Sequence, residues 1–272
     1  MNTRLNLRLL ASVTLPVAAF VVHSSATVLT LVDDNSLVSI DTANGVTGWE
    51  VDGQNQLEQQ WFWYRTGSDT REYSIDSIGG LQTKLTDANF NAGDDVAILR
   101  YYNSDFAVSV SYFLTGGALG SGTSDLAEQI EIENFTNASL TFTFFQYSNF
   151  DLGSSASDES VFINGGQVIT QTDAQSAVSE TVVTPEPGAT EAGFYSTTLS
   201  ALEDGDIDNL NNTIVAGVGD VTWALQWDFV IAPNSSVIIS KDKQVSAVPE
   251  PGSFGLIAGM MALGWIAMRR RD

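Results

Sequence analysis

Apolar and polar residues alternate with a period of two in several parts of the chain. In residues 106–112 (FAVSVSY) and 140–144 (LTFTF) every second side chain is large and apolar, which is typical of a β-strand with one face in a core. Residues 129–133 alternate in the same way, and the polar segment 134–139 predicts a hairpin to the next strand. A later strand places five apolar residues on one face: Trp223, Leu225, Trp227, Phe229 and Ile231.

Short strands separated by turns predict the fold class. The connections are rich in Gly, Asn, Asp and Ser, as in residues 116–124 and 202–212. No segment has the pattern of an amphipathic helix of three or more turns. We therefore expect an all-β domain, an antiparallel β-sandwich of many short strands. The opening, with turns at Asn44-Gly45 and Asp52-Gly53, is similar to that of large carbohydrate-active β-sandwiches.

The C-terminal 25 residues form a segment of their own, numbered 248–272. Prolines flank a glutamate in Pro249-Glu250-Pro251, the 16 residues 253–268 carry no charge, and Arg269, Arg270 and Arg271 follow. As a helix, the uncharged run would span only ~24 Å, less than the ~30 Å core of an average bilayer. The arginines favour a cytoplasmic C-terminus. An ordinary short membrane anchor and a core helix are the alternatives.

This order of triplet, apolar helix and basic end resembles the PEP-CTERM sorting signal of Gram-negative bacteria. The resemblance implies recognition of Pro249, Glu250 and Pro251 by a membrane protease-transpeptidase, exosortase. It also implies that the transmembrane helix and the arginines are removed or exchanged after export. Hosts of this signal usually make exopolysaccharide. Residues 60–65, 122–130 and 219–223 resemble segments in the uncharacterised β-rich bodies of other such proteins.

The N-terminus has the features of a secretory signal peptide, residues 1–26. Arg4 and Arg8 precede the 14-residue apolar run 9–22, and small residues follow at Ser24-Ser25-Ala26. We expect a signal helix that is cleaved after Ala26, with a retained transmembrane helix as the alternative. The body, residues 27–247, is then one all-β extracytoplasmic domain.

The composition of this body excludes several function classes. It has six basic residues against 31 acidic ones, a formal charge of −25, and so it would repel nucleic acid. The chain has no cysteine, and its one histidine, His23, lies in the predicted signal peptide. Ser-His-Asp triads, cysteine nucleophiles and zinc-histidine sites are therefore excluded from the body.

An aromatic strand is the best candidate for binding. In residues 60–65 (QWFWYR), Trp61 and Trp63 share one face, and exposed rings could stack on a sugar with Arg65 supplying polar contacts. The alternative is that both faces of the strand are buried, because aromatic residues are common in sandwich cores.

Acidic residues offer two weaker candidates. Asp204, Asp206 and Asp208 alternate as in a calcium loop, but Asn209 and Val215 stand where such a loop needs Gly and Glu, and a solvated acidic loop is the alternative. Glu131 and Glu133 could form a glycosidase pair, although chance alone would give such a pair in so acidic a body.

These observations lead to an expectation of function. We expect an exported envelope or extracellular-matrix protein that is not an enzyme, has no catalytic residue and is associated with exopolysaccharide. It is held in the inner membrane by its C-terminal helix, then processed and released to the cell surface or beyond. Its partners would be exosortase, the membrane and exopolysaccharide, with no nucleic acid. We expect no cofactor other than calcium. The alternatives are a carbohydrate-binding module and a carboxylate-based polysaccharide-active enzyme.

Overall fold

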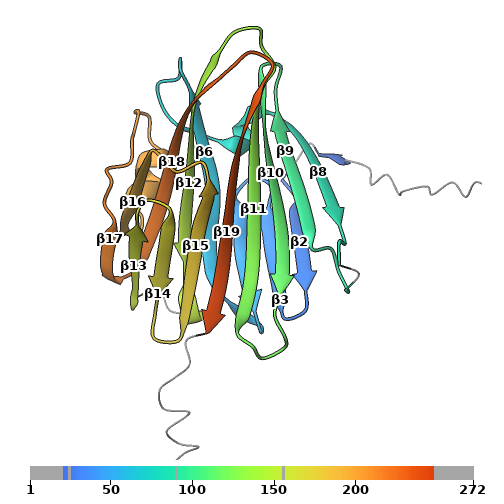
Figure 1. Ribbon diagram of the computed structural model, residues 1–272, viewed down its shortest axis with the longest axis vertical. Coiled ribbons are helices and arrows are strands. Elements are labelled where there is room, and N and C mark those ends of the chain that lie inside the picture. Colours follow the sequence, from blue (N-terminus) through green and yellow to red (C-terminus); the bar gives the residue numbers. More distant parts are fainter. Residues whose placement is uncertain (1–20, 24–25, 90, 155–156, 248–272) are drawn as a thin grey trace, which may run out of the picture.

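A computed structural model describes residues 21–23, 26–89, 91–154 and 157–247. These residues form two antiparallel sheets whose strands run roughly along the long axis of the molecule (Figure 1). The larger sheet has ten strands in the spatial order β1 (Val21–His23), β8 (Gly80–Thr86), β9 (Val96–Tyr102), β10 (Phe106–Gly116), β11 (Thr123–Asn134), β19 (Ser236–Ala247), β15 (Ser176–Thr184), β14 (Val168–Thr172), β13 (Glu159–Asn164) and β17 (Val215–Gly219).

The second sheet has nine strands and packs face to face with the first. Its order is β16 (Ala189–Phe194), β18 (Val221–Ile231), β12 (Leu140–Phe150), β6 (Leu57–Thr66), β4 (Gly45–Val51), β3 (Ser36–Asp41) and β2 (Val28–Asp33), with β5 (Gln54–Asn55) beside β4 and β7 (Tyr73–Ser74) beside β6. Helical turns in the described residues are short: η1 (Ile75–Ile78), η2 (Leu152–Ser154) and α1 (Thr197–Leu202). The predicted all-β antiparallel sandwich is confirmed.

Aromatic side chains fill the space between the sheets. The ring of Phe62 stacks on that of Phe144, and the ring of Phe150 on that of Trp223. Trp223 and Trp227 are buried, as the alternation in their strand predicts. Aromatic residues bury large areas, so these stacked rings make a major contribution to the stability of the sandwich.

The hairpin predicted at residues 134–139 is wrong. β11 pairs with β10 and β19, whereas β12 pairs with β18 and β6, so the chain crosses here from one sheet to the other. The Asn134 amide nitrogen donates to the carbonyl oxygens of Ala138, Ile231 and Ala232 and so fixes the crossing. A period of two shows which residues share a face, but it does not show which strand lies alongside.

Four charged side chains lie within the sandwich. Lys241 and Lys243 on β19 each form ion pairs with Glu128 on β11 and Glu180 on β15, and all four side chains are fully buried. Gln60 and Gln146, from the opposite sheet, donate to Glu128 and Glu180. Two positive and two negative charges therefore balance in the core, and amides connect them to the second sheet.

The predicted end segments fall largely outside the described residues. The sorting motif and its helix, residues 248–272, lie beyond β19, and residues 1–20 and 24–25 are likewise outside. β1 falls inside the predicted signal peptide and pairs with β8. No helix in the described part of the chain is long and apolar enough to cross a membrane.

Candidate active site

The outer face of the nine-stranded sheet is covered on one side by α1 and the loop after it, residues 203–214. The ladder between β12 and β18 places Phe145 opposite Gln226 and Thr143 opposite Asp228, and β16 places Glu191 opposite Ala224. Because alternate residues of a strand point to the same side, these side chains form one surface, which the loop overlies. Phe145 is fully buried beneath it.

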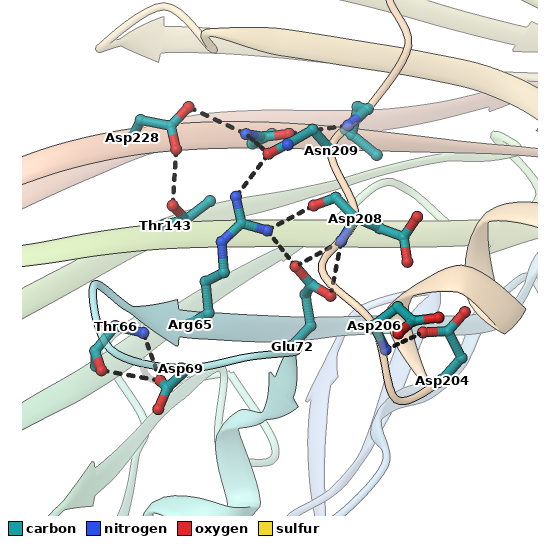
Figure 2. A network of polar contacts seen from close by, with 12 residues as sticks. Arg65, Thr66, Asp69, Glu72, Thr143, Asp204, Asp206, Asp208, Asn209 and Asp228 are labelled. Atoms are coloured by element: carbon teal, nitrogen blue, oxygen red, sulfur yellow. Dashed lines mark hydrogen bonds and ion pairs between the residues drawn. The ribbon is translucent and has the colours of Figure 1, made fainter.

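Arg65 connects the loop to the sheet, as Figure 2 shows. Its guanidinium donates to the Glu72 carboxylate, to the Asp208 carbonyl oxygen at 2.6 Å and to the Asn209 amide oxygen at 2.6 Å. It also lies 5.5 Å from the centre of the Phe145 ring. Glu72 is buried and accepts hydrogen bonds from the Asp208 backbone nitrogen. The rigid fork of an arginine suits such a junction of several acceptors.

The hydrogen-bond network continues onto β18. The Gln226 amide nitrogen donates to Asn209 and to Asp228, both at 3.1 Å, and the Thr143 hydroxyl donates to Asp228 at 2.7 Å (Figure 2). The Gln226 oxygen accepts from the Leu210 backbone nitrogen. The loop is therefore hydrogen-bonded to β6 and β18, and Thr143 on β12 fixes Asp228 on β18.

A cavity of about 220 Å³ lies between this loop, α1 and the sheet. Glu191 on β16 contributes a carboxylate, which accepts from the Thr198 hydroxyl at 2.5 Å and from the Asn211 backbone nitrogen at 3.1 Å. The complete lining is Phe145, Glu191, Thr197, Thr198, Ala201, Leu202, Asp208, Asn209, Leu210 and Asn211. It combines two carboxyls, two amides and two hydroxyls with an aromatic ring and aliphatic side chains.

The surroundings of Asp208 favour its protonated form. Burial raises the pKa of Asp208, Asp204 and Asp206 raise it further, and Glu191 adds to the effect, while Arg65 acts in the opposite direction. Asp208 thus holds its proton to a higher pH than an ordinary aspartate. Two carboxyls in unequal environments can act as an acid and a base.

Trp61 and Trp63 do not present rings to solvent. They are 2 % and 3 % exposed. Trp61 donates to the Ser74 hydroxyl and packs edge-on against Tyr101, and Trp63 packs edge-on against Tyr147. The alternative, in which both tryptophan rings are buried, is therefore the one that the structure shows. Arg65 takes part in the hydrogen-bond network under the loop.

The structure separates the three aspartates of the candidate calcium loop. The Asp204 carboxylate accepts from the Asp206 backbone nitrogen, both residues are exposed, and Asp208 lines the cavity. Among the described residues, no group of three or more His, Asp or Glu side chains is placed to hold a metal ion. The remaining acidic candidate, Glu133, pairs with Arg100 on the outside of the ten-stranded sheet.

Sequence reasoning missed Glu191, Thr198 and Asn211. These residues carry no motif and are spread over 21 positions of chain. They come together only because β16 pairs with β18 and the loop 203–214 folds back over this pair of strands. The alternation in β18 was the one usable signal, because it marks Gln226 and Asp228 as the side opposite the core.

No family model and no curated protein matches the sequence. The structure is similar to a bacterial glucoamylase in complex with acarbose, with a TM-score of 0.56 and 6 % identity over 86 % of this chain. It is also similar to galactose 1-epimerase from Lactobacillus acidophilus NCFM, with a TM-score of 0.54 and 10 % identity over 85 % of this chain. The chain has the fold of these enzymes. It spans 37 % of the glucoamylase chain and 98 % of the epimerase.

A putative aldose 1-epimerase from Escherichia coli K12 has the same fold, with a TM-score of 0.50, 11 % identity, and coverage of 82 % of this chain and 100 % of that one. The expectations of a non-catalytic matrix protein and of a body that is not an enzyme are therefore wrong, since the fold is one that carbohydrate-active enzymes use. Those expectations rested on the two end signals, on the acidic all-β body and on the missing histidine and cysteine. Such absences exclude particular mechanisms but leave carboxylate chemistry open.

Proposed function

We propose that this protein binds a saccharide in the cavity under α1 and converts it by proton transfer, with Asp208 as the acid and Glu191 as the base. The observation that carries the proposal is the meeting of two carboxyls from separate segments in one cavity lined by hydroxyls and amides. The fold, shared with sugar-converting enzymes, supports the substrate class.

The size and chemistry of the cavity suit a single sugar ring. Its volume of about 220 Å³ is below the ~300–1,000 Å³ of pockets for drug-sized ligands. Carboxylate and amide oxygens accept hydrogen bonds from sugar hydroxyls, while the aliphatic and aromatic side chains contact C–H faces. The bonds that Glu191 now accepts from Thr198 and Asn211 would be exchanged in part for bonds to the sugar.

Binding is measured by titrating the purified full-length chain, in mild detergent, with a panel of aldohexoses and their oligosaccharides. We expect at least one sugar to bind saturably. Glu191→Gln and Asp208→Asn should each weaken its affinity about ten-fold or more, because each replaces a carboxyl that hydrogen-bonds the sugar with an amide of different donors and acceptors. Polarimetry of anomer exchange and assay of reducing ends then follow conversion, which both substitutions should abolish.

Matched control variants test whether the effects come from the cavity or from the negative charge of the chain in general. Glu203→Gln changes an exposed carboxyl of the same loop, and Glu186→Gln one in the connection before β16; both should leave affinity unchanged. If every sugar fails to bind, or if all four variants behave alike, the proposal is wrong. Binding without conversion would remove the acid and base roles.

We infer that the chain is exported and first held in the inner membrane by a C-terminal transmembrane helix, after removal of an N-terminal signal helix. The sorting motif Pro249-Glu250-Pro251, as a substrate of exosortase, supports later release to the surface, where exopolysaccharide would be met. Ala26 is exposed directly before β2, and β19 ends at Ala247. The boundary at Ala247 falls at the end of the described sandwich, whereas cleavage after Ala26 would remove β1, which pairs with β8.

Deletion of residues 248–272 tests the anchor. The truncated chain keeps every strand of the described sandwich, so it should fold and move from the membrane fraction to the periplasm or medium. Fractionation followed by mass determination of the intact protein distinguishes release from processing. Unchanged membrane retention of the truncated chain would contradict the inference.

A further inference from the structure

Buried polar atoms without hydrogen-bond partners gather at one end of the outer face of the nine-stranded sheet. The ladder between β12 and β18 ends with Asn149 opposite Thr222. Beyond this end of the ladder, Asp151 follows β12 and Asp220 precedes β18. Five oxygens here are buried: Tyr147 Oη, Asn149 Oδ1, Asp151 Oδ1, Asp220 Oδ1 and Thr222 Oγ1. The Tyr147 and Thr222 hydroxyls lie within reach of each other, whereas the three Asn and Asp oxygens have no partner within the described residues.

The ladder brings these oxygens close together. Residues opposite one another in an antiparallel pair have Cα atoms ~4.5–5.5 Å apart, and same-face neighbours on one strand are ~7 Å apart. The side chains of Asn149 and Thr222 therefore start ~5 Å apart, and Asp151 lies near enough to Asp220 for their charges to interact. Asn149 and Thr222 are 4 % and 0 % exposed, so neither side chain can turn to solvent.

The electrostatic surroundings of this cluster are negative. Asp151 lies near two other carboxylates, those of Glu58 and Asp220. Neither Asp151 nor Asp220 forms an ion pair with any lysine or arginine of the described residues. A buried polar atom without a partner is costly, and two neighbouring carboxylates add repulsion.

A hard cation would compensate both costs at once, since every unpartnered atom of the cluster is an oxygen. Calcium binds six to eight oxygens at 2.3–2.6 Å and accepts carboxylates, amide oxygens and hydroxyls in irregular arrangements, whereas magnesium requires near-octahedral geometry and retains water. We propose that Tyr147, Asn149, Asp151, Asp220 and Thr222 form a calcium site. It is separate from the cavity under α1 and from Asp204 and Asp206.

Calcium titration of the full-length chain by calorimetry and by thermal unfolding tests the site. We expect saturable binding, preferred over magnesium, and a rise in Tm with calcium. Terbium bound in place of calcium should emit when tyrosine is excited, because the Tyr147 oxygen would be a ligand. Asp151→Asn/Asp220→Asn should weaken binding about ten-fold or more and remove the terbium emission.

Two further variants test whether calcium binds at this cluster and not at Asp204 and Asp206. Asn149→Asp adds a third carboxylate and should tighten calcium binding. Asp204→Asn/Asp206→Asn changes two acids of the other candidate and should bind calcium like the wild type. The proposal is overturned if millimolar calcium has no effect on the wild type, or if binding is lost in the Asp204/Asp206 variant and kept in the Asp151/Asp220 variant. Sugar binding is measured separately, with chelator, so the two proposals can fail independently.

Discussion

Glu128→Gln should destabilise the sandwich by about 3–5 kcal/mol, the cost of removing one partner from a buried ion pair. Glu128 contacts both Lys241 and Lys243, and all three side chains are fully buried. Without the charge of Glu128, the ammonium groups of Lys241 and Lys243 would have only Glu180 as an ion-pair partner. The free energy of unfolding in urea gives the measurement, with Glu131→Gln, a half-exposed position of the same strand, as the matched control with a change below about 0.5 kcal/mol.

The pH dependence of this loss has a definite sign. Burial by itself would raise the pKa of Glu128, but Lys241 and Lys243 lower it from 4.5 to about 2. A lowered carboxyl pKa contributes stability above the unfolded value, and that contribution disappears as the pH falls from about 4.5 towards about 2. The difference between wild type and Glu128→Gln should therefore shrink on acidification. A gap that stays constant down to pH 2 would show that the charge of Glu128 is not what stabilises the core.

Arg65→Gln should detach the loop 203–214 from the sheet and abolish sugar binding. The substitution removes the charge that pairs with buried Glu72 and the fork that contacts Asp208 and Asn209. The cost of an unpaired buried carboxylate is about 3–5 kcal/mol, but here the loop can lift away to let water reach Glu72. We therefore expect a smaller loss of global stability than for Glu128→Gln, together with a mobile loop.

Limited proteolysis and hydrogen exchange of residues 203–214 measure this loosening. Arg65→Lys retains the charge but replaces the planar fork of two nitrogens with a single one, so it cannot match the positions of all three acceptors, and it should give an intermediate result. Arg71→Gln is the matched control, because Arg71 stacks on Tyr73 and lies outside the network. Full protection of the loop in Arg65→Gln would mean that Gln226 and Asp228 hold it without the arginine.

The sequence pattern predicts the faces of strands better than their neighbours. The alternation in β18 correctly places Trp223 and Trp227 in the core. A one-residue shift in the register of β18 would move both indole rings to the other face of the sheet. The same logic fails at β19, where Lys241 and Lys243 occupy the inner positions. Two lysines separated by one residue resemble a solvated edge, and only the glutamates of strands β11 and β15, far away in the chain, make their burial tolerable.

The candidate site was predictable only in fragments. Arg65 was a candidate sugar contact because of its aromatic neighbours, whereas in the structure it bonds to a loop 143 positions later. Asp208 was noticed for the spacing of its carboxylates, yet its relevance comes from Glu191 across the cavity. Non-local pairing of this kind leaves no local signal, because each partner segment looks like an ordinary polar turn or strand.

The place of β19 in the sheet has a consequence for biosynthesis. The last strand of the sandwich lies in the middle of the larger sheet, between β11 and β15 (Figure 1). Until it is synthesised, β11 and β15 have no ladder partner on their facing edges, and Glu128 and Glu180 lack their lysines. Contacts of such long sequence separation form slowly. The emerging chain would therefore stay unfinished until its end arrives, a delay that keeps it open to chaperones and to passage across a membrane.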